Sequence, residues 1–141
     1  MHKIISFVIL LPVVCILGQA QAELAIIAHK SNANANMDPS DLARIFLGKS
    51  GNFPSGDTAV PIDQVDSSPV YSEFYQKVAN KTPSQLKAYW SRLIFTGKGQ
   101  PPRALSSAAE IKELIASNPN LVGYINSNEI DDSIKVLLTI P

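Results

Sequence analysis

The residues best placed to do chemistry are two serines in the run Asp66-Ser67-Ser68-Pro69. This run follows an expected strand and opens an expected helix, where free backbone N–H groups and serine hydroxyls can hold an anion. Ser31 and Asn32 follow the first expected strand and can point into the same crevice, at the carboxyl ends of the strands. The run also fits an ordinary helix N-cap, so the anion site and the plain cap remain alternatives.

Catalytic and metal-binding chemistry finds little support in the sequence. His29 is the one histidine outside the N-terminal segment, and the spacing of the aspartates and serines indicates no catalytic partner for it. One histidine with scattered carboxylates does not make a metal-ligand set. Gly48-Lys49-Ser50 lacks the glycine that a phosphate-binding loop requires five residues before its second glycine. We therefore expect no catalytic residue, no metal and no cofactor, and a small hydrolase using His29 is the least favoured hypothesis.

The elements that must position these residues follow from hydrophobic periodicity and helix-capping signals. Strands are predicted at the short apolar runs 24–28, 60–65, 121–125 and 134–138. Helices are predicted to begin near Asp38, Ser67 or Ser68, Thr82 and Ser107, where capping residues precede apolar residues at helical spacing. Segment 98–104, rich in glycine and proline, is expected to be a loop. Strands separated by helices imply an α/β domain with a mainly parallel four-stranded sheet flanked by about four helices.

Residues 1–22 have the organisation of a cleavable export signal. Lys3 precedes an apolar run over 4–17, and Ala20-Gln21-Ala22 fits a cleavage site. The apolar run is shorter than the roughly 20 residues that a membrane-spanning helix needs. We therefore expect cleavage after Ala22 and a periplasmic or secreted domain over 23–141 that is not embedded in a membrane. Cleavage also removes Cys15, the single cysteine, and with it thiol and disulfide chemistry.

Length and charge limit the domain further. Residues 23–141 suffice for one domain with its own core. The chain has 12 basic and 12 acidic residues, so removal of Lys3 leaves a net charge of about −1. No run of like charges is present, so broad electrostatic binding of nucleic acid or of anionic membrane is not expected. Tyr89, Trp90 and Phe95 stand at helical spacing and are expected to be core rather than a binding surface.

Three motifs carry a resemblance to a known family. The run Arg44-Ile45-Phe46-Leu47-Gly48-Lys49, followed by Phe53 and Gly56, is similar to the segment IFxGKxxxWxDG of phosphate-type periplasmic substrate-binding proteins. Residues 89–102 (YWSRLIFTGKGQPP) and 118–125 (NPNLVGYI) resemble a compact subgroup, commonly labelled phosphate ABC transporter substrate-binding proteins. The resemblance implies a single lobe with the periplasmic-binding-protein fold. It also implies phosphate or a related oxyanion as ligand, with an ABC permease or another envelope protein as partner.

The sequence departs from the family pattern in its loop and its length. The family's glycine-rich oxyanion loop is replaced by Asp66-Ser67-Ser68-Pro69, and the loss of glycine limits close backbone approach to phosphate. Receptors of this class close two lobes over their ligand, whereas 23–141 suffices for about one, which gives an open and partly hydrated site.

Two non-enzymatic hypotheses follow from the resemblance and its departures. The first is a domain that binds phosphate or a related oxyanion for ABC transport or sensing, with Ser67 and Ser68 as donors and Ser31 and Asn32 as helpers. The alternative is a ligand-free protein-interaction module of the cell envelope that keeps the fold and binds a partner through the loop 97–103.

Overall fold

Five strands form one sheet in the order β3-β2-β4-β1-β5. The computed structural model describes residues 12–13 and 23–141, so the predicted export signal, Cys15 included, lies outside the described residues except for Pro12 and Val13. The strands are β1 (Leu24–Ala28), β2 (Val60–Gln64), β3 (Arg103–Leu105), β4 (Leu121–Asn126) and β5 (Lys135–Ile140). The helices are α1 (Pro39–Phe46), α2 (Pro69–Ala79), α3 (Pro83–Phe95) and α4 (Ala108–Ala116), with a short 3-10 turn, η1 (Ser127–Glu129). The predicted α/β fold is therefore confirmed, with all four expected strands and four expected helices in place.

Four of the five strands point in the same direction, and β1 is the exception. β2 pairs in parallel with β3 and β4, whereas β1 runs antiparallel to both β4 and β5. The sheet is mainly parallel in this sense, but it has one strand more than expected. The additional strand, β3, is an edge strand at the end of the segment expected to be a loop. It is three residues long and none of them is fully buried, so no apolar run marks it in the sequence.

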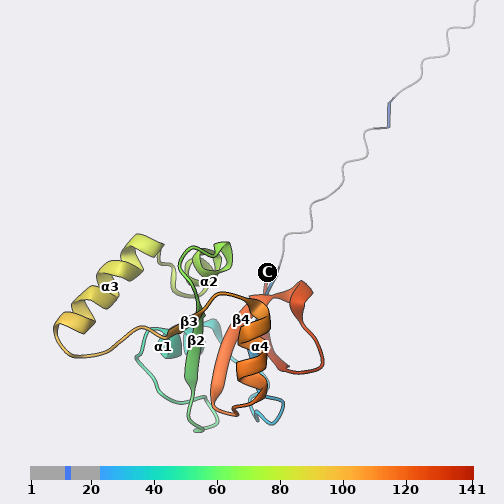
Figure 1. Cartoon of the computed structure of the whole chain (residues 1–141), viewed down its shortest axis with the longest axis horizontal. Coiled ribbons are helices and arrows are strands. Elements are labelled where there is room, and N and C mark those ends of the chain that lie inside the picture. The colour runs from blue at the N-terminus through green and yellow to red at the C-terminus, as the bar shows by residue number, and fades with distance from the viewer. Residues whose placement is uncertain (1–11, 14–22) are drawn as a thin grey trace, which may run out of the picture.

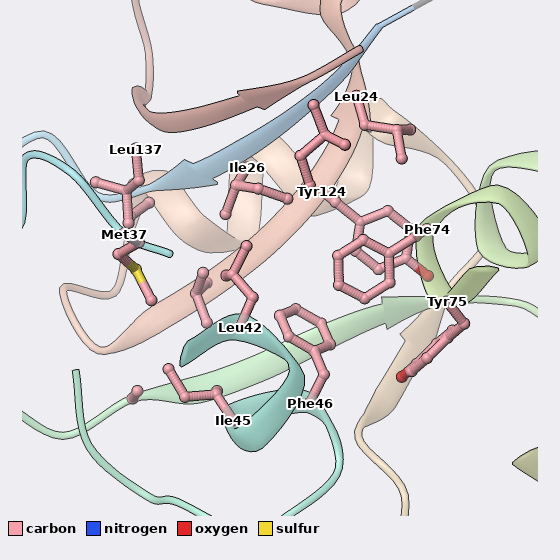
Figure 2. Close-up of a cluster of buried hydrophobic side chains, with 14 of the residues drawn as sticks. Leu24, Ile26, Met37, Leu42, Ile45, Phe46, Phe74, Tyr75, Tyr124 and Leu137 are labelled. Atoms are coloured by element: carbon pink, nitrogen blue, oxygen red, sulfur yellow. The ribbon is translucent and has the colours of Figure 1, made fainter. Parts of the chain in front are cut away.

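Helices cover both faces of the sheet (Figure 1). On one face, α1 and α2 pack over an aromatic core in which Phe46 and Phe74 contact Tyr124 of β4 (Figure 2). On the other face, α4 contributes Ile111 and Ile115 to a second, aliphatic core. The sheet is therefore the middle layer of three, with a buried apolar cluster on each of its faces.

The interior strand β1 contributes side chains to both cores. Leu24 and Ile26 belong to the aromatic cluster, whereas Ala25 and Ile27 belong to the aliphatic cluster on the opposite face. Every residue of β1 is buried, so the strand is apolar throughout instead of alternating. Continuous apolar runs are typical of buried parallel strands, and this is why the sequence gives no sign that β1 is reversed.

α3 projects from the body of the domain (Figure 1). Leu86 and Trp90 are buried, and the Tyr89 hydroxyl donates a hydrogen bond to the Leu47 carbonyl at 2.7 Å. The last turn is not covered, so Ile94 is 54% exposed and Phe95 is 92% exposed. The prediction that Phe95 belongs to the core is therefore wrong, because the apolar stripe of α3 is longer than the surface on which the helix rests.

The described residues contain no helix with the length and apolar character that crossing a bilayer requires.

Gly123 of β4 allows α4 to lie directly on the sheet. A Cβ atom there would stand 3.0 Å from Ile115 Cδ1 and 3.1 Å from Ile111 Cγ2. Gly123→Ala should therefore lower the free energy of unfolding by about 1–3 kcal/mol, as overpacked cores generally do. Urea denaturation measures this against Gly51→Ala, a position where an added Cβ meets nothing within 4 Å. Equal stability of the two variants would contradict a close contact at Gly123.

Candidate functional site

The turn between β2 and α2 carries two of the four predicted site residues, Ser67 and Ser68. Ser68 is the N-cap of α2, and its hydroxyl accepts a hydrogen bond from the Val70 N–H at 3.3 Å. The same hydroxyl donates to Gln64 Oε1 at 2.8 Å, which ties the turn to the buried end of β2. Ser67 is exposed, and within the described part of the chain its hydroxyl has no hydrogen-bond partner. Ser67 is therefore the serine whose hydroxyl is available to a ligand.

This turn lies where the carboxyl ends of three parallel strands meet. Gln64, the last residue of β2, is in register with Leu105, the last residue of β3. The Gln64 side-chain amide donates to the Tyr124 carbonyl of β4 at 3.0 Å. In open α/β sheets, ligands bind in the crevice outside the carboxyl ends of the parallel strands. The β2–α2 turn therefore occupies the position at which this architecture generally places a ligand.

A buried carboxylate lies directly beneath the turn. Asp63 of β2 is 4% exposed, and its oxygens accept hydrogen bonds from the hydroxyls of Tyr75 and Tyr124. The Tyr75 hydroxyl lies 2.6 Å from Asp63 Oδ2, and the backbone N–H of Gln64 donates to Oδ1 at 3.1 Å. Asp63 therefore connects β2 to both α2 and β4. Asp63 is not among the site residues predicted from the sequence; its position inside an apolar strand is the signal for a buried role.

Burial dominates the electrostatics of this cluster. Loss of hydration raises the pKa of Asp63 to about 6, although the hydrogen bonds from Tyr124, Tyr75 and Gln64 oppose the shift. Burial, reinforced by the nearby carboxylate, raises the pKa of Tyr75 and of Tyr124 well above the ordinary tyrosine value. Burial together with the charges of Asp63 and Asp66 raises the pKa of Tyr71 to about 12. The tyrosines therefore remain hydrogen-bond donors at neutral pH.

A cavity of about 450 Å³ lies beside the turn, between α2 and α3. Asp66 lines it from the turn, and Lys87 lines it from α3 together with Ser84. The lysine brings a positive charge to the same hollow as the Asp66 carboxylate. One hollow next to the turn therefore carries both a cationic and an anionic side chain.

Ser31 and Asn32 lie at the opposite edge of the sheet from Ser67 and Ser68. β1 is reversed, so its carboxyl end is in register with the start of β4 instead of its end, Ala28 opposing Val122. Accordingly, Ser31 and Asn32 line a cavity of about 460 Å³ with Thr58 and Asn120, which precede β2 and β4. The prediction of one crevice shared by all four residues is therefore wrong, because it assumed that β1 is parallel to its neighbours.

Ser31 and Asn32 instead take part in a local polar turn. His29 Nδ1 lies 2.8 Å from the Ser31 hydroxyl and accepts the Ser31 backbone N–H at 3.1 Å. Asn32 Oδ1 accepts both the backbone and the side-chain N–H of Asn34, at 2.9 and 2.8 Å. Lys135 Nζ donates to the Asn32 carbonyl at 2.7 Å. In the described ranges, no three His, Cys, Asp or Glu side chains are grouped closely enough to hold a metal ion.

Comparisons with solved structures identify the fold. An ABC-type phosphate transport receptor from Vibrio cholerae superposes with a TM-score of 0.65 at 19% identity, over 82% of this chain and 46% of its own. A phosphate ABC transporter substrate-binding protein from Clostridium perfringens, solved with bound phosphate, gives 0.63 at 24% identity, over 82% and 45%. PstS from Borrelia burgdorferi gives 0.62 at 21% identity, over 82% and 47%. No protein-family model and no curated protein matches the sequence.

The chain has the fold found in phosphate ABC transporter substrate-binding proteins. The resemblance first seen in sequence motifs is thereby confirmed at the level of the fold. The chain spans less than half the length of each of these solved proteins. Because one fold hosts many functions, the ligand has to be argued from the site itself.

Asp63 makes the stability of the fold depend on pH. Its pKa is about 6 in the folded chain against 3.8 ordinarily, so the folded state binds the proton more tightly. The free energy of unfolding should therefore fall as the pH rises from about 4 to about 6, by a total of about 3 kcal/mol. Denaturation at about pH 7 and about pH 5 should show a gain of stability in acid that Asp63→Asn abolishes.

Asp131, the other aspartate with a shifted pKa, does not contribute to the difference in stability between about pH 7 and about pH 5. Hydrogen bonds from Lys112 and Ser133 lower its pKa, so it costs stability only as the pH falls below 3.8. An equal pH dependence in the wild-type protein and Asp63→Asn would contradict the role given to Asp63.

Proposed function

We propose that this chain is a non-enzymatic, substrate-binding-protein-like domain that binds phosphate or a related oxyanion at the start of α2. The observation that carries the proposal is the position of Ser67 and Ser68. They lie in the turn that leads into an 11-residue helix, with Ser68 as its N-cap, beside the carboxyl ends of three parallel strands. The fold is shared with transport receptors, one of which was solved with phosphate bound.

The physics of the turn favours a small anion. The positive end of the α2 dipole points at the turn, and the first turn of α2 contains no acidic residue. The exposed Ser67 hydroxyl is a ready donor, whereas the Ser68 proton already goes to Gln64. We therefore assign the main ligand contact to Ser67, with Ser68 as a second donor only if its bond to Gln64 is exchanged.

The charges around the turn favour a partly protonated oxyanion. Asp66 is exposed immediately before the two serines and repels a dianion, but it can accept a hydrogen bond from a protonated oxygen. Lys87 lines the same cavity as Asp66 and offsets part of its charge. The proposed site is thus weakly selective and open, with binding tuned by the protonation of the ligand.

The proposed setting is the periplasm, after removal of the export signal. There the domain would hand an oxyanion to an ABC permease or report it to a sensing partner, without chemical change of the ligand. This setting rests on the predicted signal over 1–22 and on the fold shared with transport receptors.

A specific observation supports the second candidate, a ligand-free interaction module. The turn 66–69 has no glycine, and the Ser68 hydroxyl is satisfied within the protein by Gln64 and Val70. A Ser68 hydroxyl that is satisfied in this way can serve as a plain helix cap and needs no ligand.

Isothermal calorimetry with inorganic phosphate separates the two candidates. Wild-type protein should bind phosphate, and Ser67→Ala should weaken the affinity by roughly tenfold or more, as expected for loss of a hydrogen bond to a charged group. The double variant Ser67→Ala/Ser68→Ala should show no measurable binding.

Two variants control for indirect effects in this titration. Ser107→Ala removes the N-cap of α4, which controls for loss of helix stability, and Ser31→Ala changes the opposite edge of the sheet. Both should bind phosphate as the wild type does. Absence of heat with the wild type, in phosphate and in sulfate, would overturn the anion site and leave the interaction module.

A further inference from the structure

The charges of this chain are distributed unevenly along the sequence. No Asp or Glu occurs between Glu73 and Glu110. The same stretch holds half of the chain's 12 basic residues, namely Lys77, Lys81, Lys87, Arg92, Lys98 and Arg103. A net charge near zero for the whole chain therefore conceals one strongly basic segment, and α3 is at its centre.

The exposed end of α3 combines these cations with an apolar surface. We call Arg92, Ile94, Phe95 and Lys98 the α3 tip; all four are exposed, and Phe95 is 92% exposed. The salt bridges of the described residues are Lys77–Glu73 and Lys112–Asp131, so neither cation of the tip forms a salt bridge within them, although Arg92 lies 5.8 Å from the centroid of the Tyr89 ring. The tip is the end of α3 that lies farthest from the sheet (Figure 1).

The tip is held in place by the rest of α3. The Tyr89 hydroxyl bonds to the Leu47 carbonyl, and the Trp90 ring lies against Gly48, where an added Cβ would stand 3.5 Å from Trp90 Cη2. The Thr96 hydroxyl donates to the Arg92 carbonyl at 2.8 Å and closes the last turn. Phe95 is therefore presented to solvent on an anchored helix, at the cost of leaving a large aromatic ring in water.

We propose that the α3 tip docks peripherally on a lipid surface that contains anionic phospholipids. An aromatic and an aliphatic side chain flanked by Arg and Lys match the boundary between headgroups and acyl chains. The Phe95 and Ile94 side chains enter the boundary region while the cations meet the phosphates. This role goes beyond the binding of a small oxyanion at α2 and does not depend on it.

The shape of the tip favours a bilayer over an acidic protein. A stable protein interface takes roughly 20–30 residues from each partner, and the tip offers one turn of a projecting helix. A bilayer needs no matching pocket, because its soft surface adapts to a convex apolar residue. Each cation near an anionic surface contributes only modestly, so the contact is weak, reversible and sensitive to salt.

Co-sedimentation of the purified full-length protein with lipid vesicles tests the proposal. One set of vesicles contains phosphatidylglycerol and phosphatidylcholine in equal parts, and the other contains phosphatidylcholine alone. The measured quantity is the change that each variant makes in the difference between the two sets, because the wild type and all variants share the same residues 1–22, Lys3 included. Phe95→Ser should weaken binding to the anionic vesicles by about tenfold. Arg92→Gln/Lys98→Gln should weaken it by about tenfold or more.

Matched variants elsewhere on the surface serve as controls. Lys30→Gln/Lys49→Gln removes two exposed cations outside α3, and Ile130→Ser removes another exposed aliphatic side chain. Both should bind the anionic vesicles as the wild type does. Equal loss in these controls, or no preference of the wild type for anionic vesicles, would overturn the proposal.

A spectroscopic variant distinguishes lipid from an acidic protein. Phe95→Trp should give a blue-shifted emission on addition of anionic vesicles and none with immobilised polyglutamate, whereas the native Trp90 is buried in both cases. Binding to polyglutamate that is as tight as binding to vesicles, and insensitive to Phe95→Ser, would assign the surface to an acidic protein. That result, or the lack of a blue shift with vesicles, rejects the lipid assignment.

Discussion

The structure depends on keeping one buried carboxylate satisfied. Asp63 lies in β2 beneath the β2–α2 turn, where its charge has little access to water. An unpaired charge in such a place is strongly destabilising, so the hydroxyls of Tyr75 and Tyr124 must both point at it. Because these tyrosines come from α2 and β4, the requirement fixes the helix against the sheet. The start of α2, beside the serines, is therefore positioned by a side chain that is itself buried.

Aromatic packing keeps this cluster dry and thereby strengthens it. The Phe74 ring stacks on Tyr124 with centroids 3.9 Å apart, and Phe46 meets both rings edge-on. Exclusion of water strengthens the hydrogen bonds to Asp63, but it also raises the cost of the charge itself. The pKa of Asp63 is raised because the loss of hydration has a larger effect than the three hydrogen bonds that stabilise the carboxylate. The carboxylate thus contributes a defined arrangement of α2 and β4 more than it contributes stability.

Local signals in the sequence predict the helices and strands well, whereas features that depend on residues far apart in the sequence are not predicted. Ser68, Thr82 and Ser107 each cap a helix as their spacing indicates, since a cap acts within one turn. The direction of β1 is set by its neighbours β4 and β5, and a strand buried on both faces has no asymmetry that reveals it. Because the direction of β1 was not predicted, Ser31 and Asn32 were assigned to the wrong edge of the sheet. The short strand β3 was not predicted, because it is a strand through its pairing with β2 and not through apolar side chains.

The net charge of the chain does not describe the charge at the end of α3, because it is a sum over all residues. Electrostatic interactions between exposed groups are screened beyond about 8 Å at physiological salt. α3 has 13 residues and is therefore about 20 Å long. Acidic residues on the body of the domain accordingly do little to neutralise Arg92 and Lys98 at its exposed end. The local excess of positive charge and the exposed Phe95 ring therefore determine what α3 binds. The net charge of the whole chain does not.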